Sequence, residues 1–141
     1  MSYKYKIKYN YDHGISIFTI YYKGNSFVGT AMCHDDDKDM ESERTGLTIA
    51  EARAYIKMMK FIKKYEIKPK VDILYHLMNN IKLSKSHNPK AYEFRMIRNQ
   101  YNYWNKKFEE IKTNINDEEK YLKEYIDQKD KLYHKLRAKK Q

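Results

Sequence analysis

The chain has 141 residues, a length that fits one domain, and 41% of them are hydrophobic. Its single cysteine, Cys33, excludes an intramolecular disulfide, and no run approaches the roughly 18 apolar residues of a membrane span. The net charge of +10 is uneven: residues 1–47 hold six Lys/Arg and seven Asp/Glu, whereas residues 48–141 hold 23 and 12. A basic half attracts polyanions, although a solvated lysine face needs no ligand. Because the N-terminus also lacks the apolar core of a signal peptide, we expect a cytoplasmic protein without membrane contact.

Three strands are predicted at the N-terminus. Residues 3–11 alternate between Tyr or Ile and Lys or Asn, the period of a half-buried strand. Ile15–Lys23 is rich in β-branched and aromatic residues, Gly24-Asn25 is typical of a two-residue hairpin, and Ser26–Cys33 forms the third strand. Gly29 within that strand indicates a bulge or a close approach of another backbone.

An acidic loop and two helices are predicted next. The loop runs from His34 to Leu47, and Thr48 with Glu51 three residues later forms a capping box that opens a helix to about Tyr65. The expected apolar stripe of this helix comprises Ala50, Ala54, Met58, Phe61 and Ile62. Pro69 suits a first helical turn, so a second helix is expected from Pro69 to about Leu83.

A long helical segment without Gly or Pro follows Asn88-Pro89, which is a good N-cap and first-turn pair. Eleven of fourteen heptad positions between residues 94 and 139 are apolar, which indicates packed long helices. The pattern leaves open one helix of roughly 50 residues or a hairpin that breaks near residues 114–117. Since the apolar stripe exceeds what the small sheet can cover, we expect a homo-oligomer.

The fold class that follows is α+β. A three-stranded antiparallel β-meander precedes long α-helices with coiled-coil-like packing. A single domain covers residues 1–141, with the sheet and acidic loop in 1–47 and the helical part in 48–141.

Few residues point to catalysis or to a metal. Cys33, His34 and the aspartates at 35–37 are adjacent, but no second cysteine or paired histidine stands at zinc spacing. There is no Gly-rich phosphate loop and no serine in a Gly-flanked turn. We therefore expect no catalytic residues, no metal and no cofactor, and a protein that is not an enzyme.

Two sets of residues are candidates for binding an anion. Arg53 lies in the first helix among small alanines, where a phosphate could approach it; the alternative is a surface arginine paired with the acidic loop. At the start of the long helix, Tyr92, Arg95 and Arg98 with Asn88 could bind a nucleotide, guanidinium to phosphate and ring to base. The alternative for this set is solvated charge beside a coiled-coil seam.

A resemblance to a known family rests on the segment from the third strand into the first helix. It reads Val28-Gly29-Thr30-Ala31-Met32-Cys33-His34, an acidic loop, Ser42-Glu43-Arg44-Thr45-Gly46, then Ile49-Ala50 and Arg53-Ala54. This resembles the phage-encoded Thoeris anti-defence proteins of the first type, over roughly residues 5–58 by motif. The resemblance leads us to expect a proline after Cys33-His34, and Asp35 stands there instead.

The resemblance implies a function without catalysis. Members of that family sequester the cyclic ADP-ribose isomer signals of a bacterial immune system, and some also hold cyclic oligonucleotides at separate sites. It implies that Arg53 binds phosphate, that Asn88, Arg95 and Arg98 also contact the ligand, and that the protein acts as an oligomer in the host cytoplasm. The alternatives from the residues alone are a nucleic-acid-binding protein that uses the basic helical half and a protein–protein inhibitor of a defence system.

Overall fold

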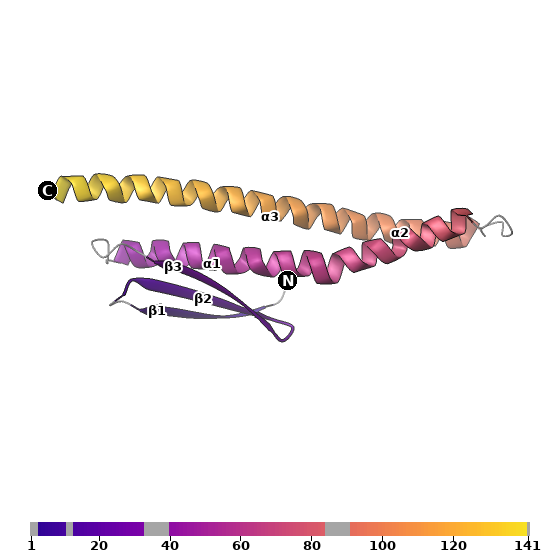
Figure 1. Cartoon of the computed structure of the whole chain (residues 1–141), viewed down its shortest axis with the longest axis horizontal. Coiled ribbons are helices and arrows are strands. Elements are labelled where there is room, and N and C mark those ends of the chain that lie inside the picture. The colour runs from indigo at the N-terminus through magenta and orange to yellow at the C-terminus, as the bar shows by residue number, and fades with distance from the viewer. Residues whose placement is uncertain (1–2, 11–12, 33–39, 84–90, 141) are drawn as a thin grey trace. The chain divides into compact units, whose positions relative to one another are not determined.

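The protein is an α+β chain, as the sequence predicts. A computed structural model describes residues 3–10, 13–32, 40–83 and 91–140. Strands β1 (Lys4–Asn10), β2 (Ile15–Tyr22) and β3 (Asn25–Met32) form one antiparallel sheet in the order β1-β2-β3. Helical elements follow: α1 (Met40–Ile62), the π-helical turn η2 (Lys63–Ile67), α2 (Lys68–Leu83) and α3 (Ala91–Lys140) (Figure 1).

The hairpin between β2 and β3 turns one residue earlier than expected. Tyr22 pairs with Asn25, so the two turn residues are Lys23 and Gly24, with φ angles of 48° and 78°. Two successive positive φ angles give the turn a backbone twist that matches the right-handed twist of the flanking strands. The predicted turn, Gly24-Asn25, was wrong because Asn25 begins β3 and supports the turn from outside, donating its side-chain N–H to the Lys23 carbonyl at 3.3 Å.

One face of the sheet packs against α1 through two glycines. A Cβ added to Gly29 of β3 would overlap the backbone of Ala50 and Ala54, both fully buried on α1. A Cβ added to Gly46 of α1 would overlap the Ser16 side chain of β2. Helix and sheet therefore meet backbone to backbone, which confirms the close approach predicted at Gly29.

Helix α1 begins eight residues before the predicted start at Thr48. The Thr48 hydroxyl donates to the Arg44 carbonyl at 2.8 Å, the back-bond of a residue inside a helix. The capping box with Glu51 is therefore wrong, and residues 40–47, assigned to the acidic loop, are helical. In the sequence, Gly46 argues against a helix over residues 40–47, because glycine is unfavourable in helix interiors. In the fold, its missing side chain lets α1 approach Ser16.

The break expected before Pro69 is also absent, because helix continues from α1 through η2 into α2. The Lys68 N–H bonds to the Lys63 carbonyl five residues earlier. Proline lacks an N–H, and its ring clashes with the carbonyl four residues before it in a regular α-helix. The wider π turn shifts that carbonyl, so the chain passes Pro69 without a break.

Helix α3 is one uninterrupted helix of 50 residues, which settles the choice left open by the sequence (Figure 1). The heptad positions from Phe94 to Lys129 are buried or half-buried, with Ile111 and Ile115 the least exposed. Further along, Leu132 and Leu136 are exposed and Tyr133 takes the covered position. A helix with 3.6 residues per turn drifts away from a strict seven-residue repeat in this manner.

The chain divides into two compact units. The first contains Met1–Met58 and Asn116–Gln141, and the second contains Met59–Ile115. In the second unit the Lys70 ammonium lies 4.0 Å from the centre of the Trp104 ring, and the rings of Tyr75 and Tyr101 are 6.2 Å apart. Over the described ranges, no helix combines the length and apolarity needed to cross a membrane.

Candidate functional site

The free edge of β3 is the starting point of the candidate site. Strand β3 is the last in the order β1-β2-β3, so one of its edges faces away from the sheet. In an antiparallel pair, alternate residues turn their backbone groups toward the partner strand and away from it. Tyr22 and Asn25 close the two-residue hairpin as a hydrogen-bonded pair. Counting from Asn25, the outward residues of β3 are the even-numbered ones, among them Val28 and Thr30.

Two cations of α1 bond to these outward carbonyls. The Arg53 guanidinium donates to the Thr30 carbonyl at 2.7 Å, and the Lys57 ammonium donates to the Val28 carbonyl at 2.6 Å. Arg53 and Lys57 are four residues apart, so they lie on the same face of α1. The contact of Gly29 with Ala50 and Ala54 fixes the distance between helix and strand and brings both cations to the edge.

The arrangement holds two positive charges in place without neutralising them. Both side chains are exposed, and over the ranges that the structure describes neither forms an ion pair. A guanidinium has five N–H donors and an ammonium has three, so one bond to a carbonyl leaves further donors on each. Two fixed cations one helical turn apart can bind the oxygens of one or two phosphate groups.

Among the described residues, the Arg53 guanidinium bonds to a backbone carbonyl. Its pairing with the acidic loop, the alternative interpretation, stays a prediction. The aspartates at 35–37 and 39 lie outside the described residues, as do Cys33 and His34. Lys57 was not predicted as a site residue. Its spacing of four from Arg53 was the available signal, but only the path of β3 shows that both cations reach the same edge.

The second predicted set lies at the start of α3, in the other unit. Tyr92 is 68% exposed, and Arg95 and Arg98 are exposed as well. The Arg98 guanidinium lies 6.0 Å from the centre of the Phe94 ring, within the range of a cation–π contact. Asn88, the fourth member, lies outside the described residues. The three described residues keep the three-residue spacing that places neighbours on one helix face.

Arg53 and the α3 set thus belong to different units of the chain, each with exposed cations. In the described ranges no three His, Cys, Asp or Glu side chains come together in a way that could hold a metal ion. Comparisons of the chain with protein-family models, with curated proteins and with solved structures gave no match.

Proposed function

We propose that the protein sequesters a cyclic ADP-ribose-type signalling nucleotide and thereby counteracts a bacterial anti-phage defence. The observation that carries the proposal is the pair of exposed cations, Arg53 and Lys57, held at the edge of β3 by bonds of 2.7 and 2.6 Å. A cyclic ADP-ribose carries two linked phosphates, and two fixed cations one helical turn apart suit such a group. Preorganised side chains lose little entropy on binding, which favours the tight binding that a sponge needs.

The mechanism is stoichiometric. The bound nucleotide is not hydrolysed, and its free concentration in the host cytoplasm falls below the level that the defence effector requires. The α3 set, Tyr92, Arg95 and Arg98, is assigned to the same class of ligand, with the arginines on phosphate and the ring on a base. A homo-oligomer would supply arginines from more than one copy, and the exposed Ile73 and Leu77 of α2 support such self-association.

The test is depletion followed by release. Purified protein is incubated with cyclic ADP-ribose isomers and washed, and the nucleotide is recovered after heat denaturation and identified by chromatography. Intact nucleotide that is depleted from solution and returns on heating supports the proposal. No depletion of any isomer removes it, and the return of only degraded nucleotide would mean that the protein is an enzyme.

Variants locate the site. Arg53→Ala is expected to weaken nucleotide binding about tenfold to a hundredfold, the effect of losing a charge-assisted bond to phosphate. Arg53→Lys keeps the charge and a donor for the Thr30 carbonyl but loses the planar fork, so we expect an intermediate loss. Lys106→Met removes an exposed cation of α3 and serves as the matched control. Circular dichroism checks that Arg53→Ala is folded. If this folded variant binds the nucleotide as tightly as the control does, the assignment of Arg53 is wrong.

The second candidate, nucleic-acid binding, is favoured by the charge of the segment that carries Arg53. Residues 48–90 contain ten Lys/Arg and three Asp/Glu, whereas residues 91–140 contain thirteen and nine. The acidic residues interspersed along α3 argue against a long phosphate track on that helix. Binding to nucleic acid would weaken steeply with salt because each neutralised phosphate releases counterions. A sponge contacts few phosphates, so its affinity for the nucleotide should depend weakly on salt.

A further inference from the structure

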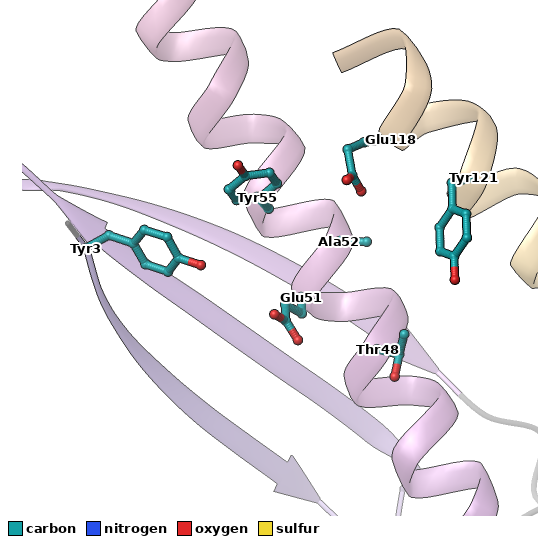
Figure 2. Close-up of a pocket in the computed structure, with 7 residues that line it drawn as sticks. All are labelled: Tyr3, Thr48, Glu51, Ala52, Tyr55, Glu118 and Tyr121. Carbon is teal, nitrogen blue, oxygen red and sulfur yellow. The ribbon is translucent and has the colours of Figure 1, made fainter. Parts of the chain in front are cut away.

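A hollow in the first unit is lined by carboxylates, whereas the β3 edge carries two cations. Its volume is about 500 Å³, within the range of small-molecule pockets. The lining residues are Tyr3 before β1, then Thr48, Glu51, Ala52 and Tyr55 of α1, and Glu118 and Tyr121 of α3. Figure 2 shows the Glu118 carboxylate pointing from α3 toward α1, and the Tyr3 phenol pointing toward the same helix from the side of the sheet.

Aromatic rings form much of the wall of this hollow. The rings of Tyr3 and Tyr55 lie 6.3 Å apart and are tilted by 48°. Tyr121, which is 63% exposed, lines the α3 side. A ring face carries partial negative charge and attracts an ammonium or guanidinium group within about 6 Å. Three tyrosines around one hollow therefore offer several such faces.

The charge of the lining is negative in a chain whose net charge is +10. Glu51 and Glu118 contribute two carboxylates, and no Lys, Arg or His is among the described residues of the lining. The pKa of Tyr55 is raised, first by burial and then by the nearby Tyr3 and Glu118, so the phenol already experiences the negative charge of its surroundings. An anion would be repelled from this hollow, whereas a cation would be attracted.

We propose that this hollow binds a small organic cation with protonated amino groups, of the diamine or polyamine class. Its ammonium groups lie against the Glu51 and Glu118 carboxylates that line the hollow, and the carbon chain packs along the rings of Tyr3, Tyr55 and Tyr121. Charge-assisted bonds to carboxylates give the attraction, and the ring faces favour an alkylammonium over a hydrated metal ion. The site uses neither Arg53 nor Lys57 and does not depend on the nucleotide proposal.

The experiment is calorimetric titration of the full-length protein with putrescine and with spermidine at fixed ionic strength. 1,4-Butanediol, with the same four-carbon chain and no charge, is the ligand control. We expect saturable binding of both amines and none of the diol. The double variant Glu51→Gln and Glu118→Gln keeps the shape of the side chains and removes their charge. It should weaken amine binding by about tenfold or more, because each carboxylate contributes a charge-assisted hydrogen bond.

A charge-matched control separates the site from the overall charge. Glu109→Gln with Glu124→Gln removes two exposed carboxylates of α3 that do not line the hollow. This control should bind amines as the unaltered protein does, and Tyr121→Leu should bind them more weakly than the unaltered protein. Equal weakening in both double variants, or amine binding that does not saturate, overturns the proposal. Nucleotide depletion by the Glu51 and Glu118 variant should be unchanged, so the two proposals fail separately.

Discussion

Gly29 determines how closely helix and sheet approach. Its hydrogen takes the place that any side chain would occupy, and the fully buried Ala50 and Ala54 lie directly against it. The same contact sets the reach of Arg53 and Lys57 to the β3 carbonyls. One missing Cβ therefore affects both the packing of the first unit and the geometry of the candidate site.

Replacing Gly29 with alanine should be costly. The added methyl group meets backbone atoms of α1, which cannot rotate away as a side chain could. We expect Gly29→Ala to lower the free energy of unfolding by about 3 kcal/mol, the upper end of overpacking costs. Urea unfolding followed by circular dichroism measures it. Ser26→Ala, at an exposed position of the same strand, should change stability little, and a similar small effect at Gly29 would contradict the close packing.

The phenol of Tyr55 should contribute to the alkaline limit of stability. Burial raises its pKa in the folded state, so as pH rises past its ordinary value the unfolded chain loses the proton first. The unfolded state then binds fewer protons than the folded state, and the free energy of unfolding falls with rising pH. We expect Tyr55→Phe to lose less stability above pH 10 and to lack a late step in the tyrosinate absorbance titration.

The control for this measurement is Tyr103→Phe, which removes a phenol that belongs to a 56% exposed side chain. It should keep the late step of the absorbance titration. Parallel loss of stability with pH in Tyr55→Phe and in the unaltered protein would show that this phenol is not the group responsible.

At the scale of elements, a partly buried hydrogen bond joins α1 to the C-terminal part of α3. The hydroxyls of Thr45, which is 5% exposed, and Tyr133 share a hydrogen bond of 2.9 Å. A double-mutant cycle with Thr45→Val and Tyr133→Phe should give a coupling energy of about 1 kcal/mol in urea unfolding. If the effects of the two single variants on the free energy of unfolding simply add in the double variant, this bond contributes nothing to stability.

The sequence predicted the kinds of elements well and their junctions poorly. Alternation predicted the first strand, β-branched and aromatic composition predicted the second, and the heptad pattern predicted the long helical segment, because these signals come from many residues. The start of α1 was missed because Gly46 is unfavourable in a helix taken alone and is explained only by Ser16 across the interface. The same limit applies to the β2–β3 turn, where Lys23 adopts a positive φ that its residue type disfavours.

The spacing of buried residues in the sequence carries a signal of the π turn. Ile62 and Ile67 are both buried and stand five residues apart, whereas Ile67, Val71 and Leu74 follow at spacings of four and three. A spacing of five matches one π turn, in which residues five apart share a face. Pro69 alone predicts a helix start, and the wider turn before it explains how the helix continues through this residue.

For the candidate site, the sequence could supply residue types but not their partners. The sequence predicts Arg53 as a site residue, yet its acceptor is a backbone carbonyl 23 residues earlier, which no side-chain pattern encodes. The hollow joins Tyr3 to Glu118 and Tyr121, residues from opposite ends of the chain. Such groupings follow from the path of the backbone and become visible only with the fold.

At the scale of the whole molecule, the exposed apolar side chains of α2 predict self-association. Ile73 is 60% exposed and Leu77 is 43% exposed, and their spacing of four places them on one ridge of the helix. The double variant Ile73→Lys and Leu77→Lys should lower the molar mass measured by light scattering after size-exclusion chromatography. His76→Lys with Asn80→Lys adds two lysines at exposed positions with the same spacing and should leave the mass unchanged. A mass unaffected by the first variant would exclude this ridge from the interface.

A protein that sequesters its ligand, the function we propose for this chain, acts in proportion to its amount, so it has to stay dispersed when it is abundant. A three-stranded sheet favours aggregation under such conditions, because the unpaired backbone groups at its edges can bond to strands of other copies and form fibrils. Here Arg53 and Lys57 occupy outward carbonyls of β3, and the exposed Lys4, Lys6 and Lys8 lie along β1 at the other edge. Like charges at both borders disfavour edge-to-edge pairing between sheets of different copies. The cations proposed to hold the ligand also protect the protein from aggregation.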